Sequence, residues 1–121
     1  MNEVSPPGWP TVIPRIAVDD PQELVRFVKA VFSASGDFNF DRPTELQLGD
    51  SILMIASSEV RGNFPAFLYV YVENVDPVFG RALDLGAIAI EDPFDTPYGD
   101  RRCTVEDRWG NCWQIASRPK R

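Results

Sequence analysis

The sequence contains no histidine among its 121 residues. Histidine is the commonest metal ligand in proteins and the side chain best suited to proton transfer near neutral pH. Its absence excludes the metal centres that use imidazole and the acid–base chemistry that depends on it. Any catalytic proton transfer would therefore require a carboxylate, a tyrosine or a cysteine.

Cysteine is almost as scarce, because Cys103 and Cys112 are the only two in the chain. They do not form a Cys-x-x-Cys motif, and a disulfide framework needs more cysteines than this. We therefore expect both thiols to be reduced and half-buried, and we expect no zinc site.

Basic residues are outnumbered, with 12 Lys and Arg against 18 Asp and Glu, and the net charge is −6. No basic stripe is present, so we expect no nucleic-acid partner, and Arg118, Lys120 and Arg121 are interpreted as a solvated tail. No apolar run approaches the roughly 18 residues of a membrane span, and the polar N-terminus lacks the apolar core of a signal peptide. We therefore expect a cytoplasmic protein with no membrane partner.

One pattern occurs twice in the chain, at an offset of about 56 residues. Val18-Asp19-Asp20-Pro21 opens an amphipathic stretch that ends near Gly36, and Asn74-Val75-Asp76-Pro77 opens another that ends at Gly86. Short apolar segments with turn residues between them follow in each half. The repeat predicts a duplicated α+β unit, with a site between its halves.

Hydrophobic periodicity predicts strand, helix and three strands in each half, after an irregular arm over residues 1–10. In the first half we expect a helix from Pro21 to Gly36 and strands over 11–18, 38–40, 45–48 and 51–56. In the second half we expect a helix from Asp76 to Gly86 and strands over 66–72, 87–91, 102–106 and 112–117. Residues 11–121 are expected to form one domain, with module one over 11–60 and module two over 65–117.

The Gly49-Asp50 pair has the composition of a two-residue hairpin turn. Such a turn places Gln47 opposite Ile52 and Glu45 opposite Met54. We therefore expect Glu45 and Gln47 to share one face of the sheet.

Several local motifs carry a family resemblance. They are the Val18-Asp19-Asp20 strand-to-helix transition, the helix end over 27–36, the strand over 67–72 with Glu73-Asn74-Val75-Asp76 after it, the Tyr98-Gly99-Asp100-Arg101 loop and, most strongly, the Asp107-x-x-Gly110-Asn111 turn. Through these motifs nearly the whole chain after about residue 10 resembles the vicinal oxygen chelate superfamily, which includes glyoxalase I, bleomycin-resistance proteins and extradiol dioxygenases. The resemblance implies an α+β fold in which two βαβββ modules form a curved mixed sheet around a cavity, with the helices outside, and it implies a homodimer.

Metal-dependent members of this superfamily place their ligands on four strands. The corresponding positions here are Ile13, Met54, Phe67 and Gln114. Three of them are apolar and the fourth is a neutral amide, which is a weak ligand on its own. We therefore expect neither a metal nor a cofactor.

Side chains alternate between the two faces of a strand, so the expected cavity face can be read from the sequence. We expect the cavity to be lined by Arg15, Glu45, Gln47, Met54, Phe67, Tyr69, Tyr71, Arg101, Trp109 and Gln114. Hairpin pairing is expected to put Cys103 and Val105 on the same face as Arg101. Aromatic walls with a few polar groups are typical of a small-molecule pocket.

Each candidate also has a purely structural interpretation. Arg15 and Glu45 could form an internal ion pair, because buried charges need partners. Arg101 could pair with Asp95 or Asp100.

The aromatic candidates likewise leave alternatives open. Tyr69 and Tyr71 could be core residues or residues of a dimer interface. Trp109 could be a packed turn residue instead of a lid over the pocket.

These features favour a non-catalytic, metal-free protein that binds an aromatic or cationic small molecule in the cavity between the modules, as drug-sequestering relatives in antibiotic resistance do. One alternative is a metal-independent enzyme of the lyase or isomerase type, which would use Glu45 as acid or base, or Cys103 or Cys112 as nucleophile. Another is an interaction protein whose pocket is filled by its own side chains.

Overall fold

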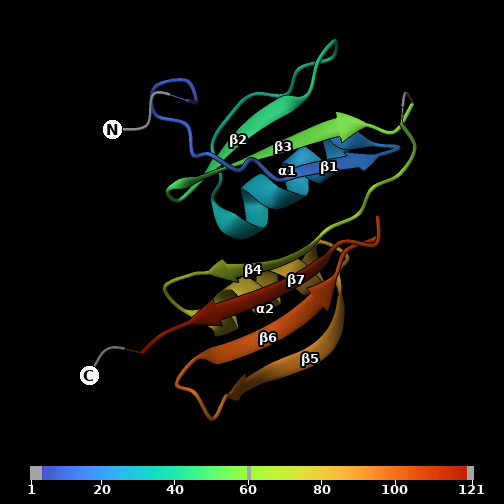
Figure 1. Cartoon of the computed structure of the whole chain (residues 1–121). Coiled ribbons are helices and arrows are strands. Elements are labelled where there is room, and N and C mark those ends of the chain that lie inside the picture. Colours follow the sequence, from blue (N-terminus) through green and yellow to red (C-terminus); the bar gives the residue numbers. More distant parts are fainter. Residues whose placement is uncertain (1–3, 60, 120–121) are drawn as a thin grey trace. The chain divides into compact units, whose positions relative to one another are not determined.

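The computed structural model describes residues 4–59 and 61–119, and the chain divides into two compact units (Figure 1). The first unit ends at Phe64 and the second begins at Pro65. The expected irregular arm contains no helix or strand over residues 4–10, and Met1 to Glu3 lie outside the described residues. The single domain over 11–121 stays a prediction.

Each unit contains one helix and one mixed sheet, which confirms the α+β class. The first unit contains β1 (Arg15–Val18), α1 (Pro21–Phe32), β2 (Thr44–Leu48) and β3 (Ser51–Ser57), with strand order β1-β3-β2. The second contains β4 (Phe67–Tyr71), α2 (Val75–Asp84), β5 (Ile88–Asp95), β6 (Arg101–Glu106) and β7 (Cys112–Ser117), with strand order β4-β7-β6-β5. In each sheet the first strand is parallel to the last, and the other neighbours are antiparallel.

The start of α1 follows its local sequence. The Asp20 carboxylate accepts a 3.4 Å hydrogen bond from the Glu23 amide, and Pro21 occupies the first helical turn, where its missing N–H costs nothing. One face of the helix packs on the sheet, and it buries Leu24, Val25, Phe27, Val28 and Val31. The helix was predicted to end near Gly36, but it ends at Phe32, and Ser33 takes the left-handed conformation (φ 60°).

Gly36 lies against β2 and does not cap the helix. Its φ of 136° favours glycine, and a Cβ on it would lie 2.5 Å from the Glu45 carbonyl oxygen. Directly before it, Ser35 exchanges two backbone hydrogen bonds with Gln47, at 3.0 and 2.8 Å. The strand predicted over 38–40 is therefore wrong, because the chain meets β2 at Ser35 and then leaves the sheet.

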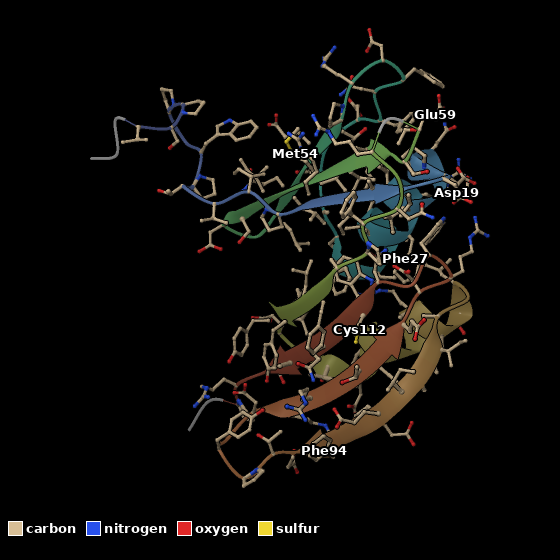
Figure 2. All side chains as sticks on the ribbon, turned by 45° about the vertical axis from the view of Figure 1, so that its right-hand side comes forward. Asp19, Phe27, Met54, Glu59, Phe94 and Cys112 are labelled. Carbon is tan, nitrogen blue, oxygen red and sulfur yellow. The ribbon has the colours of Figure 1, made fainter. Side chains whose placement is uncertain are left out.

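The predicted hairpin is confirmed. Glu45 pairs with Met54 and Gln47 with Ile52, while Gly49 adopts a φ of 60° in the turn. Alternation along the strands buries Leu46, Leu53 and Ile55 beneath α1. Figure 2 shows Met54 on the opposite face of this sheet from α1, the helix that carries Phe27. We call this the open face of the first sheet.

In the second unit α2 begins one residue before the predicted start, at Val75, and ends at Asp84 before Gly86. Its buried residues are Val75, Val78 and Ala82, whereas Phe79 and Leu83 are half-buried. The helix packs on β5, β6 and β7.

β5 is longer than predicted, since it continues through Pro93 to Asp95 in a region expected to be a loop. Register shifts between Ala89 and Glu91 and between Glu91 and Phe94 interrupt its pairing with β6. β5 is an edge strand, where bulges and a proline do not break an interior ladder.

The predicted face of β6 is wrong. Cys103 pairs with Ile115 and Val105 with Trp113, so all four lie on the buried side beneath α2, with no exposed surface. Arg101 starts the same side of β6. The residues that share a face with Gln114 are its partner Thr104 and, two positions along, Arg102. A one-residue difference in register exchanges the two faces of a strand.

The Asp107-x-x-Gly110-Asn111 turn is a buried hydrogen-bond cluster. The Asp107 carboxylate accepts bonds from the amides of Trp109 and Asn111, from the Asn111 side chain and from the Trp113 indole, at 2.9 to 3.2 Å. The Asn111 side-chain oxygen accepts in turn from the Ala66 amide at 2.9 Å. The motif therefore closes the β6–β7 hairpin and attaches the start of β4 to it.

Candidate functional site

The first unit contains a pocket of about 580 Å³, within the range of roughly 300–1,000 Å³ that is common for small-molecule sites. Its lining comes from β1, from Pro21 at the start of α1, from the end of β3, from the segment 38–43 between α1 and β2, and from the segment that follows β3 up to Phe64. All of these elements belong to the same unit.

Phenylalanines form much of the apolar wall. Phe38 and Phe40 make an edge-to-face pair with ring centroids 5.0 Å apart, and Phe40 is 88% exposed. Phe64 is 57% exposed, and its backbone exchanges hydrogen bonds of 2.9 and 3.2 Å with Ala17 of β1. The fold thus holds aromatic rings at the pocket without burying them, which is the unusual state for large apolar side chains gathered at one place.

Charged side chains line the same pocket: Arg15, Arg42, Arg61, Asp41 and Glu59. Arg42 lies 3.6 Å from Asp41, in an exposed ion pair. The one polar side-chain contact of Arg15 within the described chain joins its Nη2 to the Met54 sulfur at 3.6 Å. Across residues 4–59 and 61–119, neither Arg15 nor Arg61 has a carboxylate within ion-pair distance.

Of the residues predicted from the sequence in the first half, Arg15 lines this pocket, whereas Glu45, Gln47 and Met54 do not. Arg15, Met54 and Glu45 are aligned across β1, β3 and β2 on the open face of the first sheet. Met54 stands between the two charges, so the suggested Arg15–Glu45 ion pair is absent from the described residues. Gln47 donates to the Gly49 carbonyl at 2.8 Å, a contact within its own hairpin.

In the second half, β4 presents a row of partly exposed aromatic side chains: Phe67, Tyr69 and Tyr71. The Tyr69 and Tyr71 rings lie 5.4 Å apart, and both hydroxyls donate to Oδ2 of Asp100, at 2.7 and 2.8 Å. These hydroxyls are therefore engaged in a contact within the second unit, while the rings stay partly exposed.

Asp100 is only 2% exposed, and Arg118 Nη2 lies 2.8 Å from its Oδ1, in an ionic contact without hydrogen-bond geometry. The hydroxyl of Tyr69, more than any other group, lowers the pKa of Asp100, and Tyr71 and Arg118 add to this effect against the opposing effect of burial. Burial, followed by the bond to Asp100, raises the pKa of Tyr69. Arg118 is thus an ion-pair partner of Asp100, although its side chain stays mostly exposed. Lys120 and Arg121 lie outside the described residues.

A second polar chain crosses the sheet from Gln114, which lies within 3.5 Å of Thr104. Thr104 donates to Glu91 at 2.9 Å, and Arg102 binds both oxygens of Glu91, at 3.0 and 3.2 Å. The bond from Arg102 is the main cause that lowers the pKa of Glu91. Arg102 also donates to the Tyr98 hydroxyl at 2.6 Å. Sequence reasoning missed Arg102 and Glu91 because it exchanged the faces of β6.

Two further candidates have structural contacts. Arg101 binds Asp76 at the start of α2 through two bonds of 3.1 and 3.2 Å, and it binds Asp95 at 3.1 Å, which confirms the structural alternative for one of its two suggested partners. Trp109 is half-buried in its turn, with the Arg108 guanidinium 4.5 Å from its ring.

The residues present do not fit the metal site of the resembled superfamily. Ile13 and Phe67 have no donor atom, the Met54 thioether is a soft ligand that already contacts Arg15, and the Gln114 amide contacts Thr104. Among residues 4–59 and 61–119, no group of three or more Cys, Asp and Glu side chains is arranged to hold a metal ion.

The cysteines are poor nucleophiles. Cys103 has no exposed surface, and burial raises its thiol pKa to about 11. Burial also raises the pKa of Cys112, which is half-buried, as expected, and lies on β7 (Figure 2). Thiols with raised pKa values carry little of the reactive thiolate near neutral pH.

The sequence matches no protein-family profile and no curated protein. The structure is similar to that of TioX from Micromonospora sp. ML1 (TM-score 0.76, 23% identity, covering 89% of this chain and 98% of that one). It is also similar to a glyoxalase/bleomycin resistance protein/dioxygenase family enzyme from Burkholderia phytofirmans PsJN (TM-score 0.76, 18% identity, 88% and 97% covered) and to a glyoxalase-related enzyme from Fulvimarina pelagi (TM-score 0.73, 19% identity, 89% and 87% covered).

No helix in the described part of the chain is long and apolar enough to cross a membrane. The structural matches extend over most of the chain and include both units. The chain therefore has the fold of the vicinal oxygen chelate superfamily, to which the glyoxalase and bleomycin-resistance proteins belong, and this confirms the resemblance found in its sequence.

Proposed function

We propose that this protein binds an aromatic small molecule without a metal and without catalysis, and that the pocket of the first unit is part of the binding site. The observation that carries the proposal is a group of phenylalanines that line a pocket of about 580 Å³. Two of these side chains, Phe40 and Phe64, stay mostly exposed in the folded unit. A planar ligand that covers these rings would gain the apolar burial that folding itself forgoes.

The chemistry around the pocket supports binding over turnover. No thiol or imidazole lines it, and its carboxylates are Asp41, which is paired with Arg42, and Glu59. The two cysteines of the second unit have raised thiol pKa values. The lack of histidine and the poor donor set at the superfamily's ligand positions support a metal-free protein.

A native mass spectrum of gently purified protein, with metal analysis of the same sample, tests this proposal. We expect no stoichiometric metal, an extra mass of small-molecule size that denaturation releases, and a homodimer. Stoichiometric metal would contradict the metal-free assignment. If the protein also fails to bind aromatic compounds added to it, the binding function is wrong.

A further inference from the structure

We infer that the pocket of the first unit takes an aromatic ligand that carries an oxyanion, a carboxylate or a phosphate, and that Arg15 is its anchor. This inference rests on the proposed binding function and adds the charge of the ligand to it. It keeps the aromatic ligand expected from the sequence and departs from the cationic one.

Arg15 has hydrogen-bonding capacity that the fold does not use. A guanidinium presents five N–H donors, and the one polar side-chain contact of Arg15 in the described chain is to the Met54 sulfur at 3.6 Å, a weak acceptor. The carboxylate aligned with it belongs to Glu45, which lies two strands away, at about 10 Å for strands spaced about 4.8 Å apart. The fork of donors on Arg15 therefore remains available to an oxyanion, whose geometry it matches.

The pocket has a charge balance opposite to that of the chain. Three arginines and two carboxylates line it, whereas the chain as a whole has 12 basic and 18 acidic residues. Asp41 is paired with Arg42, and Glu59 forms no ion pair with Arg61 in the described structure. Arginine charge gathered at a concave, partly apolar surface concentrates the field there and attracts an anion.

Aromatic and cationic groups stand on neighbouring parts of this wall. Arg15 and Ala17 are two residues apart on β1 and share its open face, and Ala17 holds Phe64 through two backbone hydrogen bonds. The Phe38–Phe40 pair lines the same pocket from the segment between α1 and β2. A ligand with a ring and an oxyanion can therefore contact the phenylalanine rings and the arginine donors at the same time. A neutral aromatic ligand would leave the arginine donors unused.

Four naphthalene compounds of one shape test the inference: 2-naphthoate, 2-naphthyl phosphate, the neutral 2-naphthamide and the cationic 2-naphthylmethylammonium. Each is titrated into the ¹⁵N-labelled full chain and followed by NMR. We expect naphthoate or naphthyl phosphate to bind about tenfold more tightly than the amide. A difference of this size corresponds to one charge-assisted hydrogen bond at a partly exposed site. We also expect the shifts to appear in the 38–43 segment and around Arg15, and the affinity of the anion to fall between 50 and 300 mM salt.

Arg15→Gln should remove most of the preference for the anion and leave the affinity for the amide unchanged. Arg26→Gln is the matched control, because Arg26 is an exposed arginine of the same unit that pairs with Glu23 and does not line the pocket. It removes the same charge and should leave the preference intact.

The outcomes separate the two proposals. Equal affinity for the anions and the amide, or tighter binding of the ammonium compound, would overturn the inference and leave aromatic binding standing. A preference for the anion that survives in Arg15→Gln would overturn the role of Arg15. Absence of binding by all four compounds would contradict the binding function itself.

Discussion

Replacing Phe40 with alanine separates ligand binding from folding. Phe40 is 88% exposed, so folding uses only a small part of its apolar surface. Since full burial of a phenylalanine contributes about 1.5–3 kcal/mol, the share that folding uses is about 0.2–0.4 kcal/mol. Its edge-to-face contact with Phe38 adds at most about 1 kcal/mol at such an exposed position. Phe40→Ala should therefore lower the free energy of unfolding by about 1.5 kcal/mol or less.

The effect on binding should be larger. A planar ligand that covers half or more of the exposed ring of Phe40 gains about 1–2 kcal/mol from it, so Phe40→Ala should weaken binding roughly fivefold to thirtyfold. Urea unfolding followed by tryptophan fluorescence gives the stability, and NMR titration with the tightest of the naphthalene compounds gives the affinity. Val12→Ala is the control, because Val12 is 75% exposed in the same unit and does not line the pocket.

Two results would refute this reasoning. If Phe40→Ala lowers stability by more than about 2 kcal/mol, the exposed ring is part of the folding core after all. If the affinity changes no more than in Val12→Ala, the ligand does not cover Phe40, and the pocket assigned to the first unit is the wrong one.

The other predictions concern the second unit. Asp107→Ala should lower the free energy of unfolding by about 2–4 kcal/mol in urea titrations, because it leaves several buried N–H groups without an acceptor. Tyr69, more than its other partners, lowers the pKa of Asp100 below its ordinary value of 3.8, so the unfolded state binds more protons in acid. The stability that results is present above the unfolded pKa and should be lost as the pH falls from there through the lowered folded pKa. Asp100→Asn should flatten that loss in urea titrations made at a series of acid pH values. Ellman's reagent at pH 8 should label Cys103 only after unfolding and Cys112 slowly in the native protein, and rapid native labelling of Cys103 would contradict its burial.

Features that depend on neighbouring residues could be predicted from the sequence. Asp20 and Pro21 start a helix through contacts within one turn, and Gly49-Asp50 sets the register of the hairpin that contains it. The Asp107–Asn111 turn likewise determines its own geometry through the side chains of its first and last residues. In each case both partners of the decisive interaction lie within a few positions of one another.

The errors arose where pairing is non-local. The alternation of aromatic and polar residues over 38–40 is typical of a strand. The backbone of Gln47, however, is hydrogen-bonded to Ser35, and the local sequence does not indicate this pairing. For β6, the residue opposite Gln114 is Thr104, and the expected pairing differed from this by one position, which exchanged the faces of Arg101 and Arg102.

Of the residues that line the pocket of the first unit, the sequence predicts Arg15 alone. The prediction rests on strand positions, whereas Phe38, Phe40 and Arg61 lie in connecting segments. The signal was present in Asp37-Phe38-Asn39-Phe40-Asp41, where large rings alternate with turn-forming residues. Such rings can be buried in a sheet or left exposed, and the path of the backbone decides between these two.

The net charge of the whole chain and the charges around the pocket favour ligands of opposite sign. A net charge of −6 favours a cation if charges act over the whole molecule. At 0.1 M ionic strength, however, charges more than about 10 Å away are largely screened, so a ligand responds mainly to the groups that surround it. Around this pocket those groups are three arginines and two carboxylates, Asp41 and Glu59, and neither Arg15 nor Arg61 has a carboxylate partner among the described residues. Screening therefore gives these side chains more weight than the remote acidic residues, and an anion is the ligand that they complement.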